Sequence, residues 1–415
     1  MRNLKDYNIR QISLSILKEV VLNKNLLNTT FDLYFGRYIL DERDKSFIEY
    51  ECKGVIEKKN ELDDIINKYS KVKTKKLDDN IYIMLLIGTF EIYYMDKVPN
   101  YATIYEIVNL TKVLTKGKLT SFVNGVLRNI ERNKESCDLN ESKIIKNKYC
   151  YFKICNDKEI QVLDEIKEKN KFCKKYDGAL NFKYSNVYYA KSYKDILELE
   201  NFKNGNILIS DASSLFLTDK LTELVKNKIS DKNQIVKIID VCAAPGGKSL
   251  SLCDNLKNNN IYIKVCDISE RKITKIIENV KRLNINCIDV IKRDATIFDN
   301  NDFEKFDVVI CDVPCTGLGV IGKKPDIKEH YTKEKLDNLV KIQNTILDVS
   351  SKYLRKGGLL SYSTCTITQE ENEDMIEKFI DAKGESFKKM FEKRINVLDE
   401  NLADGFYMCI MEKEA

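Results

Sequence analysis

Two cysteines stand just past runs of apolar residues that are typical of buried strands. Cys315 lies in "DVPCTGLG", after "FDVVICDV", and Cys365 lies in "YSTCT", fifty residues later and after "GGLLSYS". The sequence has no CxxC pair and a single histidine, His330, which we expect at the surface, so we expect no metal site. A thiolate is also a nucleophile. The two thiols could therefore serve nucleophilic chemistry, or they could be two buried structural cysteines.

A second group of candidate residues lies in "IIDVCAAPGGKSLSLCDNL", where a predicted buried strand runs through a Gly–Gly turn into a helix. Free backbone N–H groups at the start of that helix would face a carboxylate or a ribose at the carboxyl edge of the sheet. The spacing excludes a P-loop, which would need glycine at Cys242, and the dinucleotide fingerprint GxGxxG is absent. An adenosine ligand without phosphates fits, and S-adenosylmethionine is the common one.

Aspartates at the ends of the next two predicted strands favour the same ligand. Asp267 lies twenty residues past Gly247, where a carboxylate can accept hydrogen bonds from both ribose hydroxyls. Asp294, in "KRDAT", ends the third strand and is placed to meet the adenine edge. Each aspartate taken alone could instead be an ordinary cap at a strand end. The residues that we expect at the cofactor are Cys242, Ala243, Ala244, Pro245, Gly246, Gly247, Lys248, Asp267, Asp294 and Asp312.

The elements that must position these residues change character along the chain. Up to about Asn133, apolar residues recur at helical spacing, as in "IRQISLSILKEVVL", which predicts an all-helical domain over residues 1–133. From about Ile235 onward, short β-branched runs alternate with helical stretches, which is typical of a parallel sheet wrapped by helices. We expect this α/β domain to span residues 206–415. Residues 134–205 have weak periodicity and are predicted only as a linker or a small subdomain.

Composition and charge narrow the class of protein. No segment approaches a membrane span and the start "MRNLKDYNIR" lacks the apolar core of a signal peptide, so we expect a cytoplasmic protein without a membrane partner. Residues 1–140 carry 23 Lys and Arg against 20 Asp and Glu, residues 141–205 carry 14 against 10, and residues 206–415 carry 32 against 34. A polyanion would therefore be held mainly by the first half, although a Lys-rich composition alone could give the same excess.

Several of these stretches together resemble one enzyme family. "CAAPGGKS", "DVPCTG", "KPDI", "YSTCT", "ENE" and "DGFYMCIMEK" are similar to the RNA cytosine-5 methyltransferases, in particular to their bacterial ribosomal branch, Sun or RsmB. "VPNYATIYEIVNLTK" and "TSFVNGVLRNI" resemble the NusB-like domain that precedes the catalytic domain in that branch. The resemblance implies a helical RNA-binding domain followed by a Rossmann-like, S-adenosylmethionine-dependent methyltransferase domain with a mostly parallel seven-stranded sheet.

The family resemblance also implies roles for the two thiols. Cytosine C5 is too weak a nucleophile to accept a methyl group until a thiolate has added to C6. By resemblance Cys365 is that nucleophile, Cys315 assists release, and Asp312 binds or protonates the base at its N3 and N4 edge. If the strands ending at Asp312 and Ser363 are neighbours, their tips lie about 5 Å apart, so both thiols can reach one flipped base. The expected substrate is a cytidine of 16S ribosomal RNA before full subunit assembly, and the expected state is a monomer.

The sequence departs from the family at two points. The family usually has an arginine before its proline-aspartate, where this chain has "GKKPDI", so Lys323 or Lys324 would replace it. The tryptophan-bearing segments expected before the sheet domain are absent, because the chain has no tryptophan. Arg128, in "FVNGVLRNI", is a candidate RNA contact or plain helix packing. Two alternatives stay open: a non-catalytic RNA-binding or antitermination factor, and the same chemistry on transfer RNA.

Overall fold

The computed structural model describes residues 8–134, 149–176, 180–229, 234–396 and 404–414. The chain divides into two compact units, which we call the helical unit (Met1–Ile144 and Lys324–His330) and the sheet unit (Ile145–Lys323 and Tyr331–Ala415). In the described residues no helix has the length and apolar character needed to cross a membrane.

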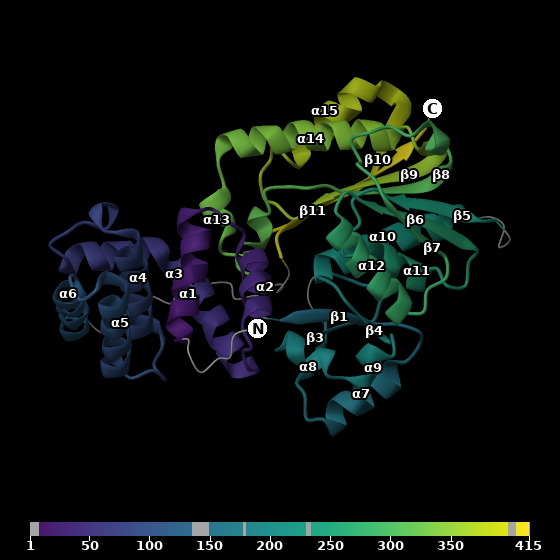
Figure 1. The fold of residues 1–415 in the computed structure, drawn as a ribbon. Helices are drawn as coiled ribbons and strands as arrows, with labels where there is room; N and C mark the ends of the chain where they lie inside the picture. Colours follow the sequence, from purple (N-terminus) through teal and green to yellow (C-terminus); the bar gives the residue numbers. More distant parts are fainter. Residues whose placement is uncertain (1–7, 135–148, 177–179, 230–233, 397–403, 415) are drawn as a thin grey trace. The chain divides into compact units, whose positions relative to one another are not determined.

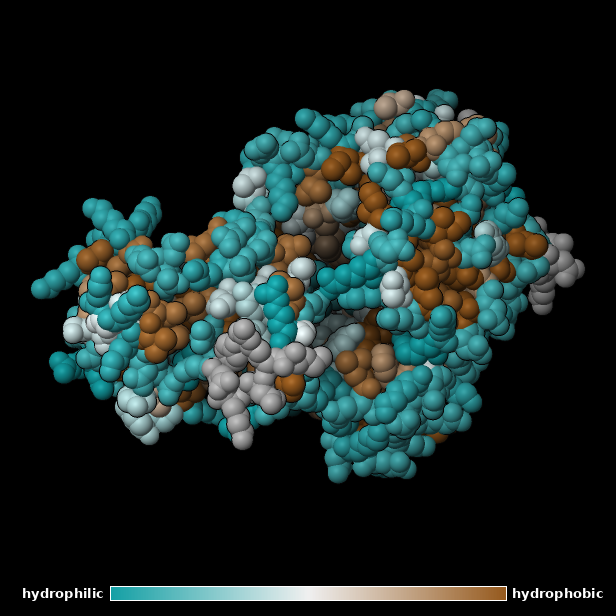
Figure 2. Space-filling model, in the orientation of Figure 1, coloured by the Kyte–Doolittle hydropathy of each residue, from teal (hydrophilic) through white to brown (hydrophobic). Residues whose placement is uncertain are grey.

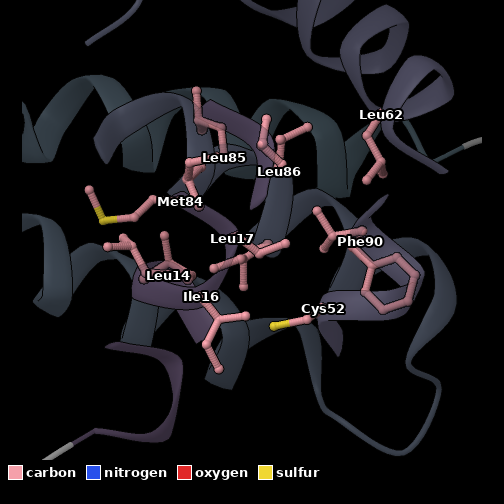
Figure 3. Close-up of a cluster of buried hydrophobic side chains, with 14 of the residues drawn as sticks. Leu14, Ile16, Leu17, Cys52, Leu62, Met84, Leu85, Leu86 and Phe90 are labelled. Carbon is pink, nitrogen blue, oxygen red and sulfur yellow. The ribbon is translucent and has the colours of Figure 1, made fainter. Parts of the chain in front are cut away.

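The helical unit is built around helix α4 (Asp79–Tyr94), which is buried on nearly all sides. Leu14 and Leu17 of α1, Cys52 of α3 and Phe90 of α4 meet in its core (Figure 3). No residue from Ile81 to Tyr93 except Tyr82 keeps substantial exposure, so α4 shows no amphipathic pattern and acts as the central rod of the unit. The other helices are α1 (Ile9–Leu17), a π-helical turn (Lys18–Leu22), α2 (Leu27–Arg37), α3 (Glu42–Tyr69), α5 (Asn100–Thr115), α6 (Thr120–Arg132) and α13 (Ile327–His330).

The "KPDI" stretch belongs to the helical unit although its neighbours in sequence belong to the sheet unit. Helix α2 begins after Leu26, which offers no side-chain cap. Oδ2 of the buried Asp326 instead accepts a hydrogen bond from the backbone N–H of Leu27 at 3.0 Å. Lys328 donates to the carbonyl of Glu57 at 2.7 Å. Asp326 therefore caps a helix that lies some three hundred residues earlier in the chain.

His330 ends this same segment. Its side chain is only 10% exposed, and Nε2 lies 3.9 Å from Asp326 Oδ2. The expectation of a surface histidine is wrong, because the segment that carries it packs into the helical unit instead of running over the surface of the sheet unit.

The sheet unit contains a seven-stranded sheet in the order β10-β11-β9-β8-β5-β6-β7 (Figure 1). The strands from β7 through β9 in this order run parallel to their neighbours, whereas β11 is antiparallel to both β9 and β10. This confirms the predicted Rossmann-like, mostly parallel sheet. The strands are β5 (Val236–Asp240), β6 (Ile261–Asp267), β7 (Ile288–Lys292), β8 (Phe306–Asp312), β9 (Leu354–Thr364), β10 (Phe387–Ile395) and β11 (Phe406–Lys413).

Helices cover both faces of this sheet, as parallel sheets require. Side chains of α10 (Ala212–Lys228), α11 (Gly247–Asn255) and α12 (Glu270–Arg282) share one apolar core with the sheet. Those of α14 (Lys333–Ser351) and α15 (Glu373–Lys383) share the other (Figure 1). Because both faces are covered, the chemistry of the sheet is confined to its strand ends.

A second, four-stranded antiparallel sheet lies within the sheet unit, in the order β2-β3-β1-β4. The element order β-α-β-β-α-β is that of the split βαβ fold. This small sheet occupies most of the stretch for which the sequence predicted only a linker or a small subdomain. Its elements are β1 (Cys150–Ile154), α7 (Glu159–Glu168), β2 (Cys173–Lys175), β3 (Val187–Ala190), α8 (Tyr193–Leu197), α9 (Glu200–Lys203) and β4 (Ile207–Ile209).

The Asp326 cap leads to a testable prediction. Asp326→Ala removes the acceptor for the first turn of α2, so its amides should exchange with solvent about 2- to 30-fold faster, as expected for the loss of a helix cap. Asp326→Asn keeps an acceptor and should restore most of the protection. The measurement is hydrogen exchange by mass spectrometry on the full chain. Glu329→Gln, which breaks the exposed pair with Lys24, is the matched control, and equal exchange in all three variants would show that Asp326 does not cap α2.

Candidate active site

The two predicted cysteines meet at the carboxyl ends of β8 and β9. These strands are parallel neighbours with Asp312 opposite Ser363, which confirms the expected neighbouring strand tips. Sγ of Cys315 lies 3.4 Å from Sγ of Cys365. Two thiols at this separation can both reach one small planar group.

A buried carboxylate holds the loop that carries Cys315. Glu371 is fully buried and accepts hydrogen bonds from Thr316 N at 2.9 Å, Thr316 Oγ1 at 2.6 Å, Gln343 Nε2 at 2.9 Å and Thr368 Oγ1 at 2.7 Å. Gln343 also donates to the carbonyl of Pro314 at 2.9 Å. Glu371 therefore ties the residues on both sides of Cys315 to helix α14 and to the loop after β9.

Asn372 does the same for the Cys365 loop. Its Oδ1 accepts from Thr364 Oγ1 at 2.6 Å, and its Nδ2 donates to the carbonyl of Thr366 at 3.2 Å. Thr366 and Thr316 are joined through their hydroxyls at 2.7 Å. The sequence stretch "ENE" is a family feature to which sequence reasoning assigns no role. Its role depends on loops that only the folded chain brings together.

Gly319 connects the loop after β8 to the Cys365 loop and to the segment before β11 through backbone hydrogen bonds. Its N–H donates to the carbonyl of Cys365 at 3.0 Å, and its own carbonyl accepts from Gly405 N at 2.9 Å. A Cβ placed on Gly319 would lie 2.2 Å from the carbonyl oxygen of Gly405. Glycine is therefore required at this position for three chain segments to meet around the thiols.

Asp312 lies beside the thiols with both carboxylate oxygens engaged. Oδ1 accepts from Ser363 Oγ at 2.7 Å, and Oδ2 accepts from Lys248 Nζ at 2.5 Å. The Lys248 side chain is 9% exposed. The sequence places Lys248 at the cofactor, and the structure adds a contact with the carboxylate predicted to bind the base.

The predicted cofactor turn follows β5. Gly246 has a φ of 96°, a left-handed conformation that favours glycine, and Gly247 begins α11. A Cβ on Gly247 would lie 2.9 Å from Ser210 Oγ, so the turn is closely packed. Ser249 Oγ donates to Asp240 Oδ2 at 2.6 Å, and burial raises the pKa of Asp240 to about 7. Cys242, Ala243, Ala244 and Pro245 form the loop between the strand and this helix.

Asp267 and Asp294 lie at the ends of the next two strands, as the sequence predicted. Asp267 is buried, and its carboxylate accepts from Ala244 N at 3.3 Å and Ser269 N at 3.0 Å. Asp294 is half-buried and accepts from Thr296 N at 2.9 Å. The N–H of Arg293 donates to the carbonyl of Asp267, which keeps the two strand ends together.

Of the two lysines in "GKKPDI", Lys323 is the one that contacts aspartates. Its Nζ lies 3.1 Å from Asp211 Oδ2 and 2.6 Å from Asp404 Oδ2. Burial, followed by the Asp211 charge, raises the pKa of Asp404 to about 7. Lys324 falls in the helical unit. Lys323 thus holds the segments before α10 and before β11 together. Asp404 is the first residue of the family stretch "DGFYMCIMEK", to which sequence reasoning assigns no role.

The environment of Cys315 disfavours its ionisation. The pKa of Cys315 is raised well above its usual value, first by the hydrogen bond of its thiol to Cys365 and then by burial. A proton is therefore held more tightly on Cys315 than on an ordinary cysteine. Within the described part of the chain, no cluster of three His, Cys, Asp or Glu residues could hold a metal ion.

Two family models match parts of this chain. The model of the family described as 16S rRNA methyltransferase RsmB/F matches residues 228–404, and that of the NusB family matches residues 7–132. The sheet unit therefore resembles RsmB/F methyltransferases, and the helical unit resembles the NusB family. It is 26% identical to the "Probable ribosomal RNA small subunit methyltransferase B" of Bacillus subtilis, over 99% of this chain and 100% of the relative. It is also 26% identical to the ribosomal RNA small subunit methyltransferase B of Vibrio vulnificus, over 98% and 100%.

Solved structures share the fold of this chain. The crystal structure of PH0851 matches with a TM-score of 0.74 at 18% identity, over 99% of this chain and 100% of that chain. NSun6 from Pyrococcus horikoshii with SFG matches with a TM-score of 0.51 at 19% identity, over 74% and 97%. Enzymes of this family use S-adenosylmethionine. The glycine turn and the buried carboxylate of Asp267 fit an uncharged ribose and the amino acid part of this cofactor.

The cofactor site can be tested at Asp267. Asp267→Ala removes the predicted ribose partner and should weaken S-adenosylmethionine binding by about 1.5–3 kcal/mol, the range for hydrogen bonds to a charged group. Wild type should bind the cofactor with no added metal. Isothermal calorimetry on the full chain checks both. Asp289→Ala, an exposed carboxylate on β7, is the control, and unchanged affinity in Asp267→Ala would exclude this residue from the site.

A second prediction concerns the ion cluster of Lys323. Lys323→Met leaves two mostly buried carboxylates facing each other, so the free energy of unfolding should fall by about 1–3 kcal/mol at pH 8. The loss should shrink at pH 5, because a carboxyl with a raised pKa is then protonated and the repulsion is gone.

Urea unfolding of the full chain at the two pH values measures this difference. Lys323→Arg should stay close to wild type because it keeps the charge, and Lys324→Met serves as the neighbouring control. A Lys323→Met loss that is equal at both pH values would contradict the electrostatic origin.

Proposed function

We propose that this protein transfers the methyl group of S-adenosylmethionine to C5 of a cytidine in 16S ribosomal RNA through a covalent bond between Cys365 and C6. The observation that carries the proposal is the 3.4 Å separation of Cys315 and Cys365 at the carboxyl edge of the sheet, beside Asp312. S-adenosylmethionine supplies the electrophilic methyl group when it is bound.

Addition comes first in the proposed reaction. The Cys365 thiolate attacks C6 of a flipped cytosine, and the electron pair of the C5–C6 bond moves so that C5 becomes nucleophilic. We assign this role to Cys365 from the family resemblance of "YSTCT". The raised pKa of Cys315 keeps a proton on the neighbouring sulfur, 3.4 Å away.

Asp312 orients the base and supplies the proton that addition requires. Its carboxylate can accept from the N4 amino group, and protonation at N3 stabilises the charge that the attack places on the ring. Lys248, 2.5 Å from the same carboxylate, is the nearest proton source. In this proposal Asp312 and Lys248 act at the N3 and N4 edge of the base, and the two thiols act at C5 and C6.

Release needs a second group near C5. After methyl transfer the C5 proton must leave as the bond between Cys365 and C6 breaks, so that the thiolate departs with its electron pair. Cys315 is close enough to act here: it passes the proton that it carried during addition to the departing sulfur of Cys365, and its own sulfur accepts the C5 proton in exchange. A single-cysteine site would form the adduct with no group placed to resolve it.

Ribosomal RNA is the proposed substrate because the relatives named above are ribosomal RNA small subunit methyltransferases. We propose residues 1–133 as an RNA-binding domain and residues 206–415 as the methyltransferase domain, acting in the cytoplasm as a monomer on RNA not yet fully assembled into a subunit. Arg128, 43% exposed and paired with Glu131, stays a candidate RNA contact. Transfer RNA is the alternative substrate of the same chemistry.

A non-catalytic RNA-binding factor is the second candidate. The NusB-family match of residues 7–132 is what favours it. Against it stands the buried carboxylate of Glu371, which holds the Cys315 loop in one conformation that a scaffold without activity would not need. The two candidates differ in whether 5-methylcytidine is formed.

The roles of the two thiols give the test of function. Wild type incubated with naked 16S ribosomal RNA and labelled S-adenosylmethionine should produce 5-methylcytidine, detected by nucleoside mass spectrometry. Cys365→Ala should form neither product nor adduct. Cys315→Ala should transfer the methyl group and then stall, leaving RNA attached to Cys365 as a shifted band on a denaturing gel.

The double variant Cys315→Ala/Cys365→Ala, which should show no shifted band, is the control. A shifted band in Cys365→Ala but not in Cys315→Ala would reverse the two roles. Full activity in both single variants would contradict the covalent mechanism, and a product other than 5-methylcytidine would overturn the proposed reaction.

A further inference from the structure

One end of the small sheet carries aromatic rings that reach the surface. Tyr149, just before β1, packs edge-on against Tyr189 of β3 with ring centroids 4.8 Å apart. Phe172, just before β2, lies 6.2 Å from the same ring. Tyr149 and Phe172 are half-buried, whereas Tyr189 is 8% exposed. The three rings therefore form one cluster, of which two members keep part of their surface in solvent.

Two lysines lie over this cluster. Nζ of Lys191 is 4.6 Å from the centroid of the Phe172 ring, and Nζ of Lys174 is 5.9 Å from it. Both lysines are exposed, and neither forms an ion pair with any residue that the structure describes. Lys171, next to the cluster in sequence, is instead neutralised by Asp195 at 2.8 Å. Lys174 and Lys191 are thus available cations beside an accessible ring.

The face of the small sheet that carries Tyr151 and Tyr189 is buried and cannot bind a nucleic acid base. In RNA-recognition motifs, aromatic side chains on the face of a four-stranded sheet stack bases. Here the corresponding side chains, Tyr151 and Tyr189, pack into the apolar core that includes α10. Lys153 on β1 is 1% exposed and binds Asp254 at 2.6 Å. Stacking is therefore restricted to the end of this sheet.

Charge and surface character favour a polyanion over a protein partner. Residues 141–205 carry 14 Lys and Arg against 10 Asp and Glu. The surface over α7, α8 and α9 is almost entirely hydrophilic (Figure 2), whereas protein interfaces have an apolar core. Lysines that meet phosphates and rings that stack on bases are the pattern of proteins that hold single-stranded nucleic acid.

We propose that this end of the sheet, the aromatic–lysine edge formed by Tyr149, Phe172, Lys174, Tyr189 and Lys191, binds a single-stranded segment of the RNA substrate. Lys174 and Lys191 move from the ring to backbone phosphates, and a base stacks on the face of Phe172 that they leave. The proposal rests on the proposed function, because that function supplies the RNA.

The lysines are tested by the salt dependence of binding. Labelled oligouridylate, which has no stable secondary structure, is titrated with the full chain at several salt concentrations. Lys174→Gln/Lys191→Gln should weaken binding and reduce the slope of log affinity against log salt by about 1.4, or about 0.7 for each single-strand phosphate that is no longer neutralised. Lys175→Gln/Lys203→Gln removes the same charge from two lysines that are ion-paired with Glu159 and Glu200, and it should leave the slope unchanged.

Phe172 is tested by stacking. Phe172→Leu keeps the apolar contact with Tyr189 and removes the aromatic face, so affinity should fall about 5- to 100-fold. Phe172→Tyr restores the face and should restore binding. Circular dichroism and S-adenosylmethionine binding show whether each variant is folded.

The outcomes separate this edge from the proposed function. If wild type methylates 16S ribosomal RNA while both the lysine variant and Phe172→Leu bind oligouridylate with wild-type affinity and slope, the edge is overturned and the function stands. If wild type neither binds oligouridylate nor methylates RNA, both proposals fall. If Lys175→Gln/Lys203→Gln lowers the slope of log affinity against log salt as much as Lys174→Gln/Lys191→Gln does, binding depends only on diffuse positive charge. That result would overturn the proposed aromatic–lysine edge.

Discussion

The parallel pairing of β8 with β9 is the constraint on which the rest of the site depends. It places Asp312 opposite Ser363, and it brings the loops after these strands close enough for Cys315 and Cys365 to touch. Pairing alone fixes only the strand ends. The buried carboxylate of Glu371, in the segment after β9, then fixes the loop of Cys315 through Thr316.

The electrostatic environment differs between neighbouring groups of the site. Contact with the Cys365 thiol and burial both raise the pKa of Cys315. Lys248 holds Asp312 and is itself nearly buried, so the pair is screened little by water. In the proposed reaction one sulfur attacks and the other acts later, although both belong to the same residue type and lie 3.4 Å apart.

The sequence predicted the parts of the site that follow from local pattern. Buried strands followed by cysteines, and a glycine turn followed by a helix, are readable because parallel strands end at one edge of the sheet. The capping of α2 by Asp326 and the ion cluster of Lys323 were not predictable, since each joins segments far apart in sequence. The small sheet was missed because β1 is buried on both faces and shows no alternation.

The covalent step is the central claim, and trapping it on a defined atom tests it most directly. A fluorine at C5 cannot leave as a proton does, so 16S ribosomal RNA containing 5-fluorocytidine should stay bound to wild-type protein after methyl transfer. Digestion of the complex and mass spectrometry then identify the modified peptide. We predict that the nucleotide is attached to Cys365, in the peptide that contains "YSTCT". Attachment to Cys315, or the absence of any covalent complex while unmodified RNA is methylated normally, would contradict the account.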